Sequence, residues 1–130
     1  GLNPSTTYWY QVQAYNVWGN SSVSNSANAT TSTPSYYIDV VENYLYFDGN
    51  GYPCSQDYMS VLSNTNWTCY FSGSWASLGT SMGSGNSTVY IMLQPNYDMS
   101  NRSSSVVFNA SGTPGDTCYI IQYGYGQSCY

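Results

Sequence analysis

Apolar and polar residues alternate along most of this chain, with the two-residue period that β-strands show. Gly, Asn, Ser and Pro interrupt the alternation at short intervals, and no stretch has the 3.6-residue period of an amphipathic helix. The pattern predicts strands at about 7–15, 22–31, 37–48, 56–63, 67–72, 87–94, 104–109 and 117–124. Strands this short and evenly spaced are typical of a β-sandwich, so we expect an all-β fold.

The same alternation predicts which side chains form the core. Successive residues of a strand point to opposite faces, so apolar residues at every second position share one face. Three strands show this arrangement, with Trp67, Cys69 and Phe71 on the first, Val89, Ile91 and Leu93 on the second, and Val106 and Phe108 on the third. We expect these faces to meet between two packed sheets.

The first 33 residues carry a more specific pattern. The residues that define it are Gly1-Leu2-Asn3-Pro4, Thr6, Tyr8, Tyr10, Val12, Ala14, Asn16, Gly19, Ser22 and Ser24. This pattern resembles the C-terminal half of a fibronectin type III domain, which implies a partial sandwich over residues 1–33. The resemblance also implies that Tyr8 is the corner tyrosine, whose hydroxyl bonds to the backbone upstream.

One face of this first segment is apolar. The residues that alternate onto it are Leu2, Tyr8, Tyr10, Val12 and Ala14. A sheet of two or three strands with an open apolar face is marginally stable by itself. We therefore expect this face to be covered by upstream chain or by strands of a neighbouring copy.

A second pattern follows a linker. Residues 31–35 contain no apolar side chain, and we place the linker itself at 34–35. The anchors beyond it are Leu45-Tyr46-Phe47, Tyr58-Met59-Ser60-Val61, Ser63-Asn64, Trp67, Trp75, Gly83-Ser84-Gly85-Asn86, Val89-Tyr90-Ile91-Met92-Leu93, Asn96, Arg102, Val106-Val107-Phe108 and Cys118-Tyr119-Ile120-Ile121-Gln122. Residues 36–130 thereby resemble a BACON domain, an Ig-like module of secreted proteins. The resemblance implies an Ig-like β-sandwich in which Trp67 and Trp75 are structural.

Charge is scarce along the whole chain. Only 5% of residues are charged, Arg102 is the single cation, His is absent, and six acids leave a formal net charge of −5. Without a basic surface we expect binding neither to nucleic acid nor to anionic lipid. The lack of His excludes Ser-His-Asp triads and His-ligated metal sites. No apolar run approaches the ~18 residues of a membrane span.

Arg102 therefore needs an explanation of its own. We expect a structural role, in which it pairs with Asp98 in the same loop or caps backbone carbonyls. The functional alternative is a ligand-binding arginine.

Four cysteines form an even set that suits two disulfides in an oxidising compartment. No Cys-x-x-Cys spacing is present, so a zinc ribbon is a poor interpretation. If successive strands after residue 43 run in alternate directions, Cys54 and Cys129 lie at one end of the sandwich and Cys69 and Cys118 at the other. We therefore predict the disulfides Cys54–Cys129 and Cys69–Cys118.

Asn-x-Ser/Thr sequons provide candidate N-glycosylation sites at Asn20, Asn28, Asn66, Asn86, Asn101 and Asn109. Each lies beside a turn signal or at the end of an apolar run, where a glycan has room, although a chain rich in Asn, Ser and Thr also forms sequons by chance. We expect Asn20, Asn86 and Asn101 to be modified most readily, because they lie in loops or at strand starts. Asn66 is less favourable because it adjoins Trp67.

Candidate chemistry is otherwise sparse. Cleavage of a glycosidic bond needs two carboxylates in one cleft, and the acids here are scattered, so we expect no enzyme and no cofactor. The segment Asp48-Gly49-Asn50-Gly51 has too few carboxylates for a calcium loop and predicts a hairpin turn. The aromatic candidates for stacking on sugar rings are Trp9, Trp18, Tyr44, Tyr46, Tyr123 and Tyr125, for which ordinary strand propensity is the alternative explanation.

These features lead to two hypotheses for an extracellular or cell-surface protein. The first is a glycosylated Ig-like subunit of a fibre, pilus-like filament or surface stalk, whose partners are neighbouring copies of the same chain. The second is a carbohydrate-binding or spacer module in a secreted multi-domain protein that processes glycans, with polysaccharide as its partner; this one rests on family analogy.

Overall fold

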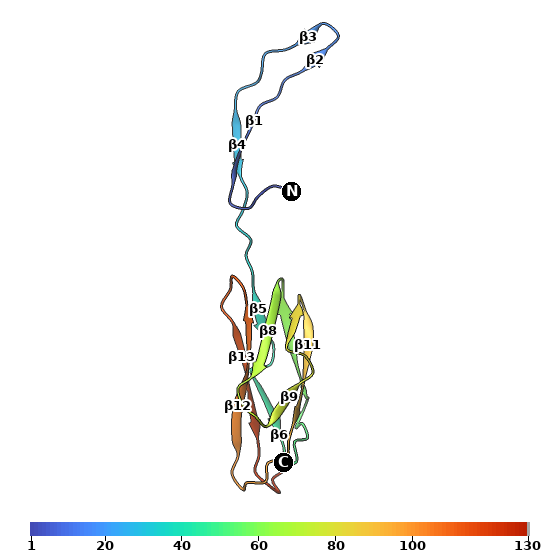
Figure 1. The fold of residues 1–130 in the computed structure, drawn as a ribbon, viewed down its shortest axis with the longest axis vertical. Coiled ribbons are helices and arrows are strands. Elements are labelled where there is room, and N and C mark those ends of the chain that lie inside the picture. Colours follow the sequence, from blue (N-terminus) through green and yellow to red (C-terminus); the bar gives the residue numbers. More distant parts are fainter. Residues whose placement is uncertain (130) are drawn as a thin grey trace. The chain divides into compact units, whose positions relative to one another are not determined.

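Strands joined by turns make up residues 1–129, the part of the chain that the computed structural model describes (Figure 1). This confirms the predicted all-β class. No helix that could span a membrane occurs among these residues. The chain divides into two units, Gly1–Ser35 and a second one that begins at Tyr36, and the division falls beside the segment predicted as a linker.

The first unit consists of two short pairs of antiparallel strands. β1 (Thr7–Tyr10) pairs with β4 (Ala27–Thr30), and β2 (Tyr15–Asn16) pairs with β3 (Gly19–Asn20). The strands predicted at 7–15 and 22–31 are therefore shorter than expected. The ladder is interrupted between the two strand pairs. There the backbone N–H groups of Val12 and Ala14 donate to the hydroxyls of Ser24 and Ser21, and not to main-chain carbonyls.

Tyr8 makes the upstream hydrogen bond that was expected of it. Its hydroxyl accepts a hydrogen bond from the backbone N–H of Asn3, five residues upstream, at 2.8 Å. The rest of the predicted apolar face is open to solvent: Tyr10 is 48% and Val12 72% exposed, and no residue of Gly1–Ser35 is buried. The first unit therefore has no core of its own.

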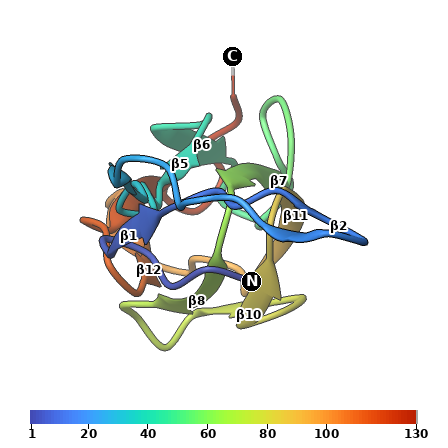
Figure 2. The same cartoon turned by 90° about the horizontal axis from the view of Figure 1, so that it is seen from above.

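The second unit is an Ig-like sandwich of two sheets. One sheet has the order β5 (Ile38–Val40), β7 (Tyr58–Ser63), β11 (Ser87–Leu93), β9 (Ala76–Leu78). The other has the order β10 (Met82–Ser84), β8 (Asn66–Phe71), β12 (Arg102–Ala110), β13 (Asp116–Gln122), β6 (Tyr44–Phe47). Seen from above, β7 and β11 lie across the interior from β12 (Figure 2). All neighbouring strands are antiparallel except β13 and β6, which are parallel.

The core follows the alternation of the strands. Its buried apolar residues are Ile38, Val40, Leu45, Phe47, Met59, Val61, Trp67, Cys69, Val89, Ile91, Val106, Phe108, Cys118 and Ile120. Phe71 and Leu93, the last members of two predicted faces, are half-buried and pack against this cluster. The predicted inner faces are thus confirmed.

The strand predicted at 37–48 is in fact two strands that belong to different sheets. β5 pairs with β7 and β6 pairs with β13, so the chain crosses the sandwich between them. Glu42 lies at this crossing, and its carboxylate accepts hydrogen bonds from the backbone N–H and the hydroxyl of Ser60 and from the side-chain amide of Gln56. Together with the bond from the backbone N–H of Val41 to the carbonyl of Ser60, these bonds hold the crossing segment against β7.

Trp67 is the largest fully buried side chain. Its indole Nε1 donates to the carbonyl of Gly85 at 2.9 Å, and its ring lies 6.0 Å from the ring of Phe108, measured between centroids. Gly83 on β10 lies against this ring, and any side-chain carbon there would collide with it. This close approach explains why the strand beside Trp67 carries glycine.

Only one of the two predicted disulfides forms. Cys54 and Cys129 are bonded, with a Cα–Cα distance of 5.4 Å. Cys69 and Cys118 are free, so the prediction of a bond between them is wrong. They pair with Phe108 and Val106 on opposite sides of β12. Strands that flank a third strand are about 10 Å apart, whereas a disulfide needs Cα atoms within about 7 Å.

Burial disfavours the thiolate form of the two free cysteines. It raises the pKa of Cys69 to about 11 and that of Cys118 to about 12, where the charges of Glu42 and Asp116 add to the effect. We expect an alkylating reagent to modify neither thiol of the folded protein at neutral pH and both after unfolding, because the thiolate is the reactive form. Mass spectrometry of the labelled chain measures this, and a Cys69 peptide linked to a Cys118 peptide would contradict it.

Gly83 and Gly79 offer a matched pair for testing the packing around Trp67. We expect Gly83→Ala to lower the free energy of unfolding by about 1–3 kcal/mol, because the indole ring and its neighbours must shift. Gly79→Ala adds the same methyl group at a site where the nearest atom, Cβ of Tyr90, is 3.6 Å away, so its effect should be small. Chemical denaturation measures both, and equal losses would contradict the proposed collision.

Candidate functional site

Three of the six acids are engaged in holding the fold. Glu42 accepts hydrogen bonds from Ser60 and Gln56. The backbone N–H of Val40 donates to Oδ2 of Asp116, with 2.6 Å between nitrogen and oxygen. Asp48 accepts the N–H groups of Asn50 and Tyr52, which forms the predicted turn. Within residues 1–129, no three His, Cys, Asp or Glu side chains lie close enough together to hold a metal ion. These carboxylates therefore act as acceptors for backbone groups.

Arg102 has the second of its two expected structural roles, the capping of backbone carbonyls. Its Nη2 donates to the carbonyls of Gln94 and Pro95, and its Nε donates to the side-chain oxygen of Gln122. The guanidinium lies 4.4 Å from the ring centroid of Trp75, so the structural role of Trp75 includes a cation–π contact with Arg102. Burial lowers the pKa of Arg102, and the charge of Asp98 works in the opposite direction.

The two tryptophans proposed for sugar stacking lie in the first unit. Trp9 is on β1 and is 69% exposed, and Trp18 is in the β2–β3 turn and is 92% exposed. Within residues 1–129, neither ring contacts another aromatic ring. Each is therefore an isolated exposed ring.

The two tyrosines proposed for the same role are joined by a third. Tyr44 and Tyr46 extend from the outer face of β6, and Tyr119 extends from the same face of β13, directly opposite Tyr44. The ring centroids of Tyr44 and Tyr119 are 5.4 Å apart with 26° between planes, and those of Tyr44 and Tyr46 are 6.4 Å apart with 24°. We call these three nearly parallel, half-exposed rings the tyrosine platform.

Sequence reasoning missed Tyr119. Alternation was sufficient to show that it points outward, because Cys118 and Ile120 on either side of it are core residues. Its contact with Tyr44 follows from the parallel pairing of β13 with β6, which local sequence does not encode. The platform is therefore a product of the strand order.

Polar groups border the platform. On β12, Ser105 lies opposite Tyr119 and Ser103 lies opposite Ile121, on the same outer face. A pyranose ring has one face of C–H bonds, which are attracted to the negative face of an aromatic ring, and a rim of hydroxyls, which need hydrogen-bond partners. Parallel aromatic rings beside serine and tyrosine hydroxyls match both needs.

Other exposed tyrosines have different geometry. Tyr58 and Tyr90 form a cross-strand pair on the four-stranded sheet, with ring planes tilted by 58°. Tyr125 lies near Tyr97, with 6.5 Å between centroids, and Tyr123 is half-buried. The predicted candidates Tyr123 and Tyr125 thus lie after β13 and outside the platform.

All six sequon asparagines are exposed. Asn20 and Asn28 lie on β3 and β4 of the first unit, Asn66 begins β8, Asn86 precedes β11, Asn101 precedes β12, and Asn109 lies near the end of β12. The side-chain oxygens of Asn86 and Asn101 accept backbone hydrogen bonds from Ser63 and Gly124, which leaves the nitrogen that would carry a sugar. Exposure therefore does not separate one sequon from another.

Comparison with known proteins gives a likeness to a solved structure. No protein-family model and no curated protein sequence matches this chain. The solved structure of a Bacteroides ovatus GH5 xyloglucanase in complex with a XXXG heptasaccharide is similar, with a TM-score of 0.62 and 25% sequence identity. The match covers 68% of this chain and 19% of the xyloglucanase chain. This chain is thus similar to a small part of a glycan-degrading enzyme.

Proposed function

We propose that this chain is a non-catalytic carbohydrate-binding module of an extracellular, multi-domain protein that processes glycans. The observation that carries the proposal is its likeness to about a fifth of a xyloglucanase chain. An accessory domain of a large enzyme would produce a match of this limited extent. The resemblance to BACON domains agrees with such a role and is part of the same proposal.

The proposed absence of catalysis has support in the acids. Glycosidases need two carboxylates that face one substrate bond. Glu42, Asp48 and Asp116 are instead occupied with backbone N–H groups. The chemistry would then belong to another part of the full protein.

The proposed extracellular location has support in the covalent structure. The Cys54–Cys129 disulfide is compatible with secretion, because such bonds persist in oxidising compartments. The polar groups of the surface are mainly hydroxyls and amides, with few charges. Such groups also suit contact with neutral polysaccharide.

The tyrosine platform is the proposed contact surface, so substitution of its tyrosines tests the proposal. Isothermal titration calorimetry measures the affinity of each variant for xyloglucan. Each ring contributes about 0.5–1.5 kcal/mol when it stacks, so Tyr44→Ala with Tyr119→Ala should weaken binding roughly 5- to 150-fold. The matched control is Tyr58→Ala with Tyr90→Ala, which removes an exposed pair from the opposite sheet and should leave the affinity unchanged.

Two outcomes would contradict this function. Equal affinity for the wild type and the platform variant would place the contact elsewhere. A wild-type chain that binds neither xyloglucan nor other neutral polysaccharides would be a spacer. Thermal unfolding of each variant shows whether a lost affinity reflects a lost fold.

A fibre subunit is the second candidate, and one observation favours it: the exposed apolar residues of the first unit, including Tyr10 and Val12. A neighbouring copy that covers them would produce elongated oligomers whose size grows with concentration. Analytical ultracentrifugation tests this function. We expect such oligomers for the wild type and their loss in the double variant Tyr10→Ser with Val12→Ser. A monomer at every concentration would contradict it.

A further inference from the structure

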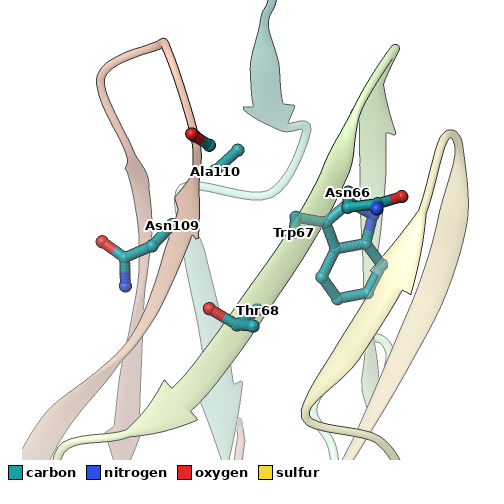
Figure 3. A pocket seen from close by; sticks show the side chains of 6 residues that line it. Asn66, Trp67, Thr68, Asn109 and Ala110 are labelled. Carbon is teal, nitrogen blue, oxygen red and sulfur yellow. The ribbon is translucent and has the colours of Figure 1, made fainter.

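A hollow of about 280 Å³ opens on the five-stranded sheet between β8 and β12 (Figure 3). Six residues line it, and they are two complete sequons, Asn66-Trp67-Thr68 and Asn109-Ala110-Ser111. The two strands are antiparallel neighbours, with Asn109 opposite Thr68 and Ala110 opposite Trp67. Segments 43 residues apart in sequence therefore meet at one place with the same motif.

We propose that these two sequons form one shared N-glycosylation site that carries a single glycan. The hollow then holds the innermost sugar of that glycan.

The lining suits the first sugar of an N-linked chain. Asn66, Thr68, Asn109 and Ser111 are exposed, so their amides and hydroxyls are available at the rim. The Trp67 ring points into the core, so the apolar surface between these polar groups comes from Ala110, which is half-buried. The C–H face of a sugar covers such a surface, while its hydroxyls and acetamido group remain among the polar side chains.

Spacing explains why the pair carries one glycan and not two. Asn109 lies opposite Thr68, so Asn66 is its diagonal neighbour across the strand pair. The Cβ atoms of diagonal neighbours are about 7 Å apart. Two branched glycans rooted this close would compete for the same hollow, and the sugar that occupies it first excludes the second.

The modification itself is a substitution at an anomeric carbon. The co-substrate is an oligosaccharide linked to a polyprenyl phosphate carrier, and an oligosaccharyltransferase catalyses the transfer. The side-chain nitrogen Nδ2 of the asparagine attacks C1 of the first sugar, forms the C–N bond and loses a proton to a base. The C1–O bond breaks, and its electron pair leaves with the lipid phosphate.

The test is site occupancy in the complete chain, secreted by a host that performs N-glycosylation. Chymotryptic glycopeptide mapping and the intact mass give the number of glycans at Asn66 and Asn109 for each molecule. Thr68→Ala and Ser111→Ala each remove one sequon without changing either asparagine. The control is Thr88→Ala, which removes the Asn86 sequon on the opposite sheet.

We expect every molecule to carry one glycan at the pair. Thr68→Ala should move all occupancy to Asn109, Ser111→Ala should move it to Asn66, and the control should change neither. A glycan-releasing amidase should cleave this glycan only after the protein is unfolded, because its first sugar lies in the hollow. Molecules with glycans at both positions, molecules with none at either, or release from the folded protein at the rate seen at other sequons would each overturn the proposal.

Discussion

The buried amide of Gln122 connects the end of β13 to the loop after β11, to β12 and to the turn after β6. This side chain is completely buried; its nitrogen donates to the carbonyls of Gln94 and Gly49, and its oxygen accepts from Nε of Arg102. Gln122 lies opposite Phe47, so the bonded amide stands where the two parallel strands end together. A buried amide without partners costs about 1–3 kcal/mol, so these bonds stabilise the end of the sandwich at which β6 and β13 run side by side.

Arg102 extends this arrangement to the surface. It holds the loop after β11 through the carbonyls of Gln94 and Pro95, and it covers Trp75, against which Phe71 packs edge-on. In a chain with one cation, that cation is committed to the fold. Hydrogen bonds from a charged donor contribute about 1.5–3 kcal/mol, which is more than an exposed ion pair with Asp98 would provide.

The sequence was sufficient for the parts of the fold that local periodicity determines. Alternation identified the inner faces of β8, β11 and β12, and the hydrogen bond expected between the Tyr8 hydroxyl and the backbone upstream is present. The sequence pattern did not predict β9 and β10, because Ala76–Leu78 and Met82–Ser84 are short and lack a clear apolar alternation. The Cys69–Cys118 prediction failed for a related reason. It assumed a simple alternation of strand directions, whereas the actual order places β12 between the two cysteines.

The candidate site shows the same division between local and global information. Tyr44 and Tyr46 could be named from sequence because they alternate with the core residues Leu45 and Phe47. Tyr119 and the meeting of two sequons could not, since both require knowledge of which strands are neighbours. Contacts between distant strands are determined by the packing of the whole sandwich, so no window of sequence contains them.

The outer face of the five-stranded sheet has room for both proposed roles. The strand order places the hollow between β8 and β12 and the platform on β13 and β6, with the outward residues of β12 common to both regions. Tyr119 lies opposite Ser105, and Asn109 lies four residues further along β12, which is about 13 Å at the rise of a strand. A glycan rooted at the hollow would therefore cover the β8 side of the face and leave the tyrosines open. One sheet could then carry a covalent sugar at one end and bind a free polysaccharide near its edge strand β6.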